Sequence, residues 1–105
     1  MLHLVTMPPT WHTGTYTIEE ITADEAASRI RNAADSDELK SHINFASTKK
    51  AIEGLTGLRI DMVQRINVPV PRDGDCFLHI RLRTRASRDR VGLADLAFFW
   101  ADYTA

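Results

Sequence analysis

The most regular pattern in this chain is an alternation of apolar and polar positions from Cys76 to Arg85. Successive side chains of a β-strand point to opposite faces of a sheet, so the pattern predicts a strand with one core face and one basic face. The polar positions after Phe77 are His79, Arg81, Arg83 and Arg85. The turn-forming residues 71–74 separate this strand from the β-rich segment 65–70, which predicts a β-hairpin.

Three other segments contain the β-branched and aromatic residues that are typical of strands. They are residues 2–6, 15–21 and 97–101. Together with the two arms of the hairpin, they predict a sheet of about five strands.

Two helices are expected between these strands. Thr22 and Glu25 have the spacing of a capping box, which predicts a helix that starts at Thr22. Asn44 is a suitable N-cap for a second helix, and Gly57 is a suitable C-terminal stop. A short helical turn is expected before the last strand. We therefore predict a single α+β domain over residues 1–105, with a small mixed sheet and two or three helices packed on it.

Charge is distributed unevenly along the chain, although the net charge is only −1. Residues 1–48 hold three basic and seven acidic side chains, whereas residues 49–90 hold ten basic and five acidic ones. The local excess of basic groups in the second segment suits a phosphate-bearing ligand. A protein that coats long nucleic acid is usually basic throughout, so we do not expect that partner.

Cysteine and histidine usage argues against a disulfide or a metal site. Cys76 is the only cysteine, and the four histidines show no ligand spacing. We therefore expect neither a metal nor another cofactor. No apolar run reaches the length of a membrane span, and no signal-peptide core is complete before Pro8. A cytoplasmic protein without a membrane partner is predicted.

Two features of the sequence could bind an anion. Guanidinium groups on alternate strand residues lie roughly 7 Å apart, near the spacing of successive phosphates, although a solvated face with paired arginines explains the same pattern. The start of the second helix, with Phe45, Ser47 and Thr48, offers backbone N–H groups and hydroxyls, although an ordinary capped helix end does so too. His42 is the histidine nearest to this helix start, and it is the candidate proton donor for a metal-free nuclease.

Six short motifs follow one another in an order that is known from one protein family. They are Met1–Leu4, Ile21–Thr22, His42–Thr48, Leu55–Gly57, Gln64–Val68 and Leu82–Arg85. In this order they resemble the small viral ring-nuclease anti-CRISPR family, whose members degrade cyclic tetra-adenylate. The resemblance implies a two-fold dimer that closes around a cyclic nucleotide between its subunits.

The resemblance also implies roles for individual residues. Ligand contacts are implied at Thr6 and Met7, at the start of the second helix, and at Arg85. The family's catalytic histidine falls on Phe45, whose phenyl ring cannot donate a proton, and the family's glutamate falls near Arg88. The resemblance therefore implies a binding pocket that is retained and a catalytic function that is lost.

The favoured function is a viral or phage anti-defence protein that binds and sequesters a cyclic nucleotide messenger at a dimer interface in the host cytoplasm. The expected ligand-binding residues are Thr6, Met7, Asn44, Phe45, Ser47, Thr48, Arg83, Arg85 and Arg88. Two alternatives stay open. One is a metal-independent ring nuclease that uses His42 as its acid, and the other is a small DNA-contacting or structural viral protein.

Overall fold

The described residues, 1–65, 69–83 and 91–105 of this computed structural model, form a sheet of five strands. The strands are β1 (Leu2–Val5), β2 (Thr15–Ile21), β3 (Leu39–Ser41), β4 (Cys76–Leu82) and β5 (Leu96–Thr104). Their order across the sheet is β2-β5-β4-β1-β3. β1 runs parallel to both β3 and β4, whereas β5 runs antiparallel to β2 and β4, so the sheet is mixed as predicted.

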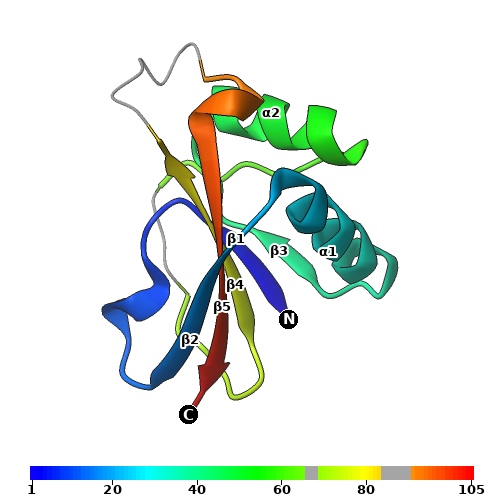
Figure 1. Cartoon of the computed structure of the whole chain (residues 1–105). Helices are drawn as coiled ribbons and strands as arrows, with labels where there is room; N and C mark the ends of the chain where they lie inside the picture. Colours follow the sequence, from blue (N-terminus) through cyan, green and yellow to red (C-terminus); the bar gives the residue numbers. More distant parts are fainter. Residues whose placement is uncertain (66–68, 84–90) are drawn as a thin grey trace.

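Two helices, α1 (Ala23–Asp35) and α2 (Ala46–Thr56), lie on one face of this sheet and contact each other (Figure 1). The loop that follows β1 lies on the opposite side and contains the 3-10 turn η1 (Pro9–Trp11). A second 3-10 turn, η3 (Leu93–Asp95), precedes β5. The predicted α+β class, with about five strands and two or three helices, is confirmed.

The ends of the helices follow from their local sequences. The N–H of Glu25 donates to the hydroxyl of Thr22 at 3.2 Å, which confirms the predicted cap of α1. The N-cap of α2 is Phe45 rather than the predicted Asn44. Gly57 closes α2 with a φ of 74°, a left-handed conformation that costs glycine little.

The predicted β-hairpin between residues 65–70 and 76–85 is wrong. The two edges of β4 are already paired with β1 and β5, so no edge remains for a hairpin partner. Residues 66–68 of the expected first arm lie outside the described residues. The strand β3 was not predicted, because its three residues are too short to show an alternating pattern. β5 is longer than the predicted segment 97–101 and continues to Thr104.

The two faces of the sheet carry different cores. On the helix side, buried apolar residues of the sheet meet those of both helices, and they include Leu4, Ile30, Ile52, Leu78, Ile80 and Phe98. On the other side a smaller buried cluster contains Val5, Phe77, Ala101 and Tyr103. The face of β4 that was expected to be basic and solvated is therefore partly covered, and Phe77 is fully buried. In the described part of the chain, no helix is long and apolar enough to cross a membrane.

Candidate functional site

The carboxyl ends of three parallel strands meet at one end of the sheet. β1, β3 and β4 run in the same direction, so the segments that leave them lie together, and ligands of parallel sheets commonly bind at this end. A cavity of about 210 Å³ opens there. It is lined by Thr6, Phe45, Thr48, Ile80, Arg81, Leu82 and Leu96. Three of the residues predicted from the sequence, Thr6, Phe45 and Thr48, are thus brought together.

Thr6 and Asn44 connect two walls of this cavity. The hydroxyl of Thr6, just after β1, donates to Oδ1 of Asn44 at 3.3 Å. Asn44 belongs to the segment between β3 and α2, so this hydrogen bond joins two strand ends. The side-chain oxygen of Asn44 thus accepts from Thr6, while the N-cap position of α2 belongs to Phe45.

The start of α2 faces the same cavity. A helix N-terminus carries partial positive charge, and the phenyl ring of the N-cap Phe45 has no oxygen that could cap it. Thr48, in the first turn, is only 6% exposed, and its side chain makes no hydrogen bond to any described residue. No fully buried side-chain oxygen in the described part of the chain lacks a partner. Solvent must therefore reach the Thr48 hydroxyl, and the cavity that Thr48 lines gives that access.

Arg81 and Arg83, two arginines of the predicted basic face of β4, have different surroundings. Arg81 is exposed, lines the cavity, and makes no ion pair or hydrogen bond with a described residue. Arg83 donates from Nη2 to Glu20 Oε1 at 3.2 Å and from Nε to the carbonyl of Leu96 at 3.1 Å. The structure therefore places Arg81 at the cavity, whereas Arg83 was the residue predicted from the sequence. The strand alternation placed both arginines on one face but could not show which one is paired.

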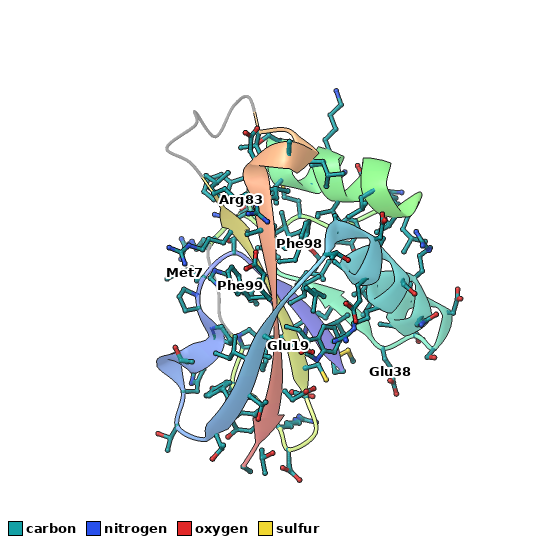
Figure 2. The ribbon with its side chains drawn as sticks, viewed as in Figure 1. Met7, Glu19, Glu38, Arg83, Phe98 and Phe99 are labelled. Carbon is teal, nitrogen blue, oxygen red and sulfur yellow. The ribbon has the colours of Figure 1, made fainter. Side chains whose placement is uncertain are left out.

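The remaining predicted residues have other positions. Met7 lies on the helix-free side of the sheet and does not line the cavity (Figure 2). Ser47 is half-buried and does not line it either. Arg85 and Arg88 lie outside the described residues, so their assignment stays a prediction.

A second cavity, of about 200 Å³, lies on the helix-free face and shares Arg81 with the first. His79 and Phe99 form part of its wall, with their ring centroids 6.2 Å apart. Phe98 and Phe99 are consecutive in β5 and point to opposite sides of that strand (Figure 2). Burial, together with the charge of Arg81, lowers the pKa of His79, so this ring is neutral at neutral pH. Arg81 is thus the cation between the two cavities.

His42 does not line either cavity. It is 4% exposed, and its Nε2 lies 3.1 Å from Nδ1 of His3 on β1. Nε2 of His3 lies in turn 3.2 Å from Oδ2 of Asp75, which precedes β4. Burial lowers the pKa of His42 to about 4, and the neighbouring His3 acts in the same direction. A buried and neutral imidazole cannot serve as the proton donor that was considered for a nuclease.

No pattern in the sequence predicted this buried cluster of Asp75, His3 and His42. Its members are separated by 39 and 72 positions, so no local spacing reveals them. They meet because β1 lies between β3 and β4 in the sheet.

Chemistry that depends on metals or on a reactive thiol has no support in the described residues. No group of three or more side chains that could hold a metal ion is found among them. Burial and the hydrogen bond to Asp102 raise the pKa of Cys76 to about 11, which keeps the thiol protonated at neutral pH. Binding by charge, hydroxyls and aromatic surface is what this site offers.

Comparison with known proteins identifies the family. A family model described as STIV B116-like matches residues 2–99. The chain belongs to the STIV B116-like family. A solved structure with the same fold is B116 of Sulfolobus turreted icosahedral virus, with a TM-score of 0.75 and 13% sequence identity. The match covers 95% of this chain and 96% of that one. No curated protein matches the chain.

The family suggested by the order of short motifs is therefore corrected. The ring-nuclease anti-CRISPR assignment is wrong, because the family model that matches nearly the whole chain is the STIV B116-like one. The viral part of the expectation is confirmed at the level of the family, which is named after a viral protein. Residue roles that rested only on the resemblance, such as those of Met7 and Arg85, lose that basis. The candidate site of this STIV B116-like protein rests on its geometry alone.

Proposed function

We propose that this STIV B116-like protein binds a cyclic nucleotide in the cavity at the carboxyl ends of β1, β3 and β4, and that it holds this ligand without cleaving it. The observation that carries the proposal is that Arg81 and Thr48 line the same cavity and that neither side chain is bonded to a described residue. Both groups recognise phosphate oxygens, and the start of α2 adds positive potential beside them.

The charge of the cavity suits a phosphodiester. Arg81 is the charged side chain among the described lining residues, and a phosphodiester carries one negative charge. Phe45 also lines the cavity and offers an aromatic face for a base. Stacking of a base on an aromatic side chain contributes on the order of 1 to 3 kcal/mol. A ligand with a phosphodiester and a base therefore uses the whole lining.

The size of the cavity limits how much of a ligand it can enclose. Its volume of about 210 Å³ lies below the roughly 300 to 1,000 Å³ of typical ligand pockets. It suits one nucleotide unit rather than a ring of several. A two-fold dimer, which stays a prediction, would supply a second copy of the cavity for a larger cyclic ligand.

Binding is favoured over cleavage by the chemistry of the lining. The described lining residues contribute two hydroxyls, one guanidinium and apolar side chains, none of which is a proton donor suited to a leaving oxygen at neutral pH. His42 is buried away from the cavity. A protein that holds a signalling nucleotide intact would lower its free concentration, which is the sequestering role expected from the sequence.

Calorimetric titration with a panel of nucleotides tests the proposal. The panel contains cyclic mononucleotides, cyclic dinucleotides, larger cyclic oligoadenylates, their linear counterparts and a long DNA duplex. We expect a cyclic member to bind, to be recovered intact after heat release, and to bind more weakly to Arg81→Gln and Thr48→Val. Arg31→Gln is the matched control, since this exposed arginine of α1 lies outside both cavities.

Three results of this titration would contradict the proposal. Binding of long DNA with a steep salt dependence and no preference for cyclic ligands would support the DNA-contacting alternative instead. Release of a linear product would mean that the protein is a nuclease. Equal binding by Arg81→Gln, Thr48→Val and Arg31→Gln would place the ligand elsewhere.

A further inference from the structure

The hydrogen-bonded chain of the side chains of Asp75, His3 and His42 crosses the sheet. It runs from Asp75, at the amino end of β4, through His3 in β1 to His42, at the carboxyl end of β3, where the candidate site lies. Asp75 is 8% exposed, His3 is 6% exposed and His42 is 4% exposed. Oδ2 of Asp75 also accepts from the N–H of Arg72 at 2.9 Å. The ring of His3 stacks on Phe77, with centroids 5.1 Å apart. These contacts hold the carboxylate of Asp75 and the ring of His3 in one orientation.

The hydrogen bonds define where the protons lie. The Asp75 carboxylate can only accept, so His3 carries its proton on Nε2. Neutral His3 then accepts at Nδ1, which requires His42 to donate from Nε2. With both rings neutral, every facing pair of atoms is one donor and one acceptor.

Protonation affects this arrangement in two steps. One added proton can be shared by the two rings and is balanced by the carboxylate of Asp75. A second proton leaves a hydrogen on both facing nitrogens, which are only 3.1 Å apart, and places two positive charges in contact. The two rings titrate as a coupled pair, and the second step breaks the hydrogen bond between them.

The other charged groups around the chain also disfavour the second proton. The N-terminal ammonium of Met1 lies 3.6 Å from Oδ1 of Asp75 and takes up part of its negative charge. Lys40 of β3 pairs with His3 in the register of β1 and β3, and its charge acts on both histidines. Burial and these cations together lower the pKa of His3 and that of His42. Asp75 is the anion that favours protonation of the pair.

In the sequence, His42 comes three residues before Phe45, which lines the cavity. The N–H of His42 donates to the carbonyl of Leu4 at 2.9 Å, which ties the end of β3 to β1. Two residues later Asn44 accepts from Thr6, and Phe45 then lines the cavity. A movement of the His42 ring therefore acts on the backbone that places Phe45 and the first turn of α2.

We propose that the chain Asp75–His3–His42 positions the wall of the cavity at residues 42–45, and that double protonation of its histidines releases this wall and weakens ligand binding. His3 and His42 are thus positioning residues that make the site acid-sensitive. The consequence for binding rests on the function proposed above, whereas the movement of the wall does not.

An NMR titration of the ligand-free, ¹⁵N-labelled protein from about pH 7.5 to about pH 3, which passes through the pKa of His42, tests the structural part. We expect the backbone amide signals of Asn44 and Phe45 to shift with the same midpoint as the His42 ring, while those of Ile30 in α1 stay in place. Far-UV circular dichroism over the same range separates this local change from unfolding. Stationary signals of Asn44 and Phe45 during the titration of His42 would overturn the proposal.

The variant His42→Gln sharpens this test. The glutamine amide can still donate to Nδ1 of His3 but cannot take up a proton, so the shifts of Asn44 and Phe45 should disappear. His12→Gln is the control, because His12 is not one of the three hydrogen-bonded side chains and does not line either cavity. Retained shifts in His42→Gln would contradict the proposal. If this variant does not fold, the wild-type titration alone tests the proposal.

Binding of 3′,5′-cyclic UMP as a probe tests the functional consequence, because neither its base nor its phosphodiester titrates in this pH range. The affinity of the wild type should fall by about twofold at about pH 4, where half of the His42 rings are protonated, and by about tenfold at about pH 3, whereas that of His42→Gln should stay nearly constant. If cyclic UMP binds with the same affinity at both ends of the range, the link to binding is wrong. If cyclic UMP does not bind at all while the NMR shifts appear, the proposed function loses support. The movement of residues 42–45 on protonation is then still supported.

Discussion

The two faces of the sheet are built from alternate residues of the same strands, yet they differ in what they bury. On the helix side, Leu4 and Leu78 join a large cluster of buried apolar residues. On the other side, Val5 and Phe77 pack beside the buried imidazole of His3. The helix-side core contributes stability that does not depend on protonation, whereas the second face buries groups whose charge depends on pH.

This difference places the candidate site at a boundary. The side chain of Arg81 projects from β4 on the helix-free side of the sheet. Its neighbours Ile80 and Leu82 line the same cavity from the helix side, where they belong to the apolar core. The cavity thus combines a rigid apolar support with a cation that is free to meet a ligand.

Removal of a side chain from the helix-side core should have the largest effect. Leu78 is fully buried, so Leu78→Ala should lower the free energy of unfolding by about 2 to 5 kcal/mol through lost burial and the cavity that remains. The loss should be the same at neutral and mildly acidic pH. Urea denaturation at both pH values measures it, with Met62→Ala at an exposed position as the control. A loss below about 1 kcal/mol would contradict the assignment of Leu78 to the core.

The histidine face should make stability depend on pH. The folded protein holds the pKa of His42 at about 4, whereas an unfolded histidine has a pKa near 6.5. The unfolded state therefore binds more protons between these values, and the free energy of unfolding should fall as the pH drops from about 6.5 to about 4. The part of this decrease that comes from His42 should be on the order of 3 kcal/mol and should be complete below about pH 4.

Urea denaturation across this pH range measures the effect, and His42→Gln should flatten the curve relative to the wild type. His12→Gln should keep the wild-type slope. An equal slope in His42→Gln and the wild type would show that other groups cause the acid sensitivity.

The two arginines of the basic face should differ in ligand binding. Arg81→Gln removes the cavity cation and should weaken binding of a cyclic nucleotide by about tenfold, which corresponds to about 1.4 kcal/mol. Arg83→Gln should change the affinity by less than about twofold, because Arg83 is already bonded to Glu20 and to the carbonyl of Leu96. Calorimetry on both variants measures the difference. A reversed order would support the sequence-based choice of Arg83.

The smallest effect is expected for the ion pair at the edge of this face. Glu20 and Arg83 are both more than half exposed, so Glu20→Gln should change the free energy of unfolding by no more than about 1 kcal/mol. The change should shrink further at high salt. A larger, salt-independent loss would mean that the pair is structurally important.

Elements with a complete local signal could be predicted from the sequence. The cap at Thr22 and the stop at Gly57 depend on side chains within a few positions, and both were found. The first two strands and the fold class followed from the hydrophobic pattern. The pairing of β4 could not be predicted, since alternation shows that a strand has two faces but not which strands lie at its edges.

The candidate site could be predicted only in part for the same reason. Thr6, Phe45 and Thr48 were expected because each lies next to a strand end or a helix start. Arg81 and Arg83 could be distinguished only once the structure showed that Glu20 pairs with Arg83. These two residues are 63 positions apart in the sequence. The cluster of Asp75, His3 and His42 depends on a strand order that local patterns do not contain.

Chemical-shift mapping with a cyclic nucleotide tests the central claim most directly. On addition of 3′,5′-cyclic UMP at neutral pH, the account predicts that the largest backbone amide shifts occur at Thr6, Phe45, Thr48 and Arg81. The same titration of Thr48→Val, which removes only the hydroxyl, should need a higher ligand concentration to reach the same shifts. Shifts concentrated instead around Ile18 and Phe99 in the second cavity, or no shifts at all, would contradict the account.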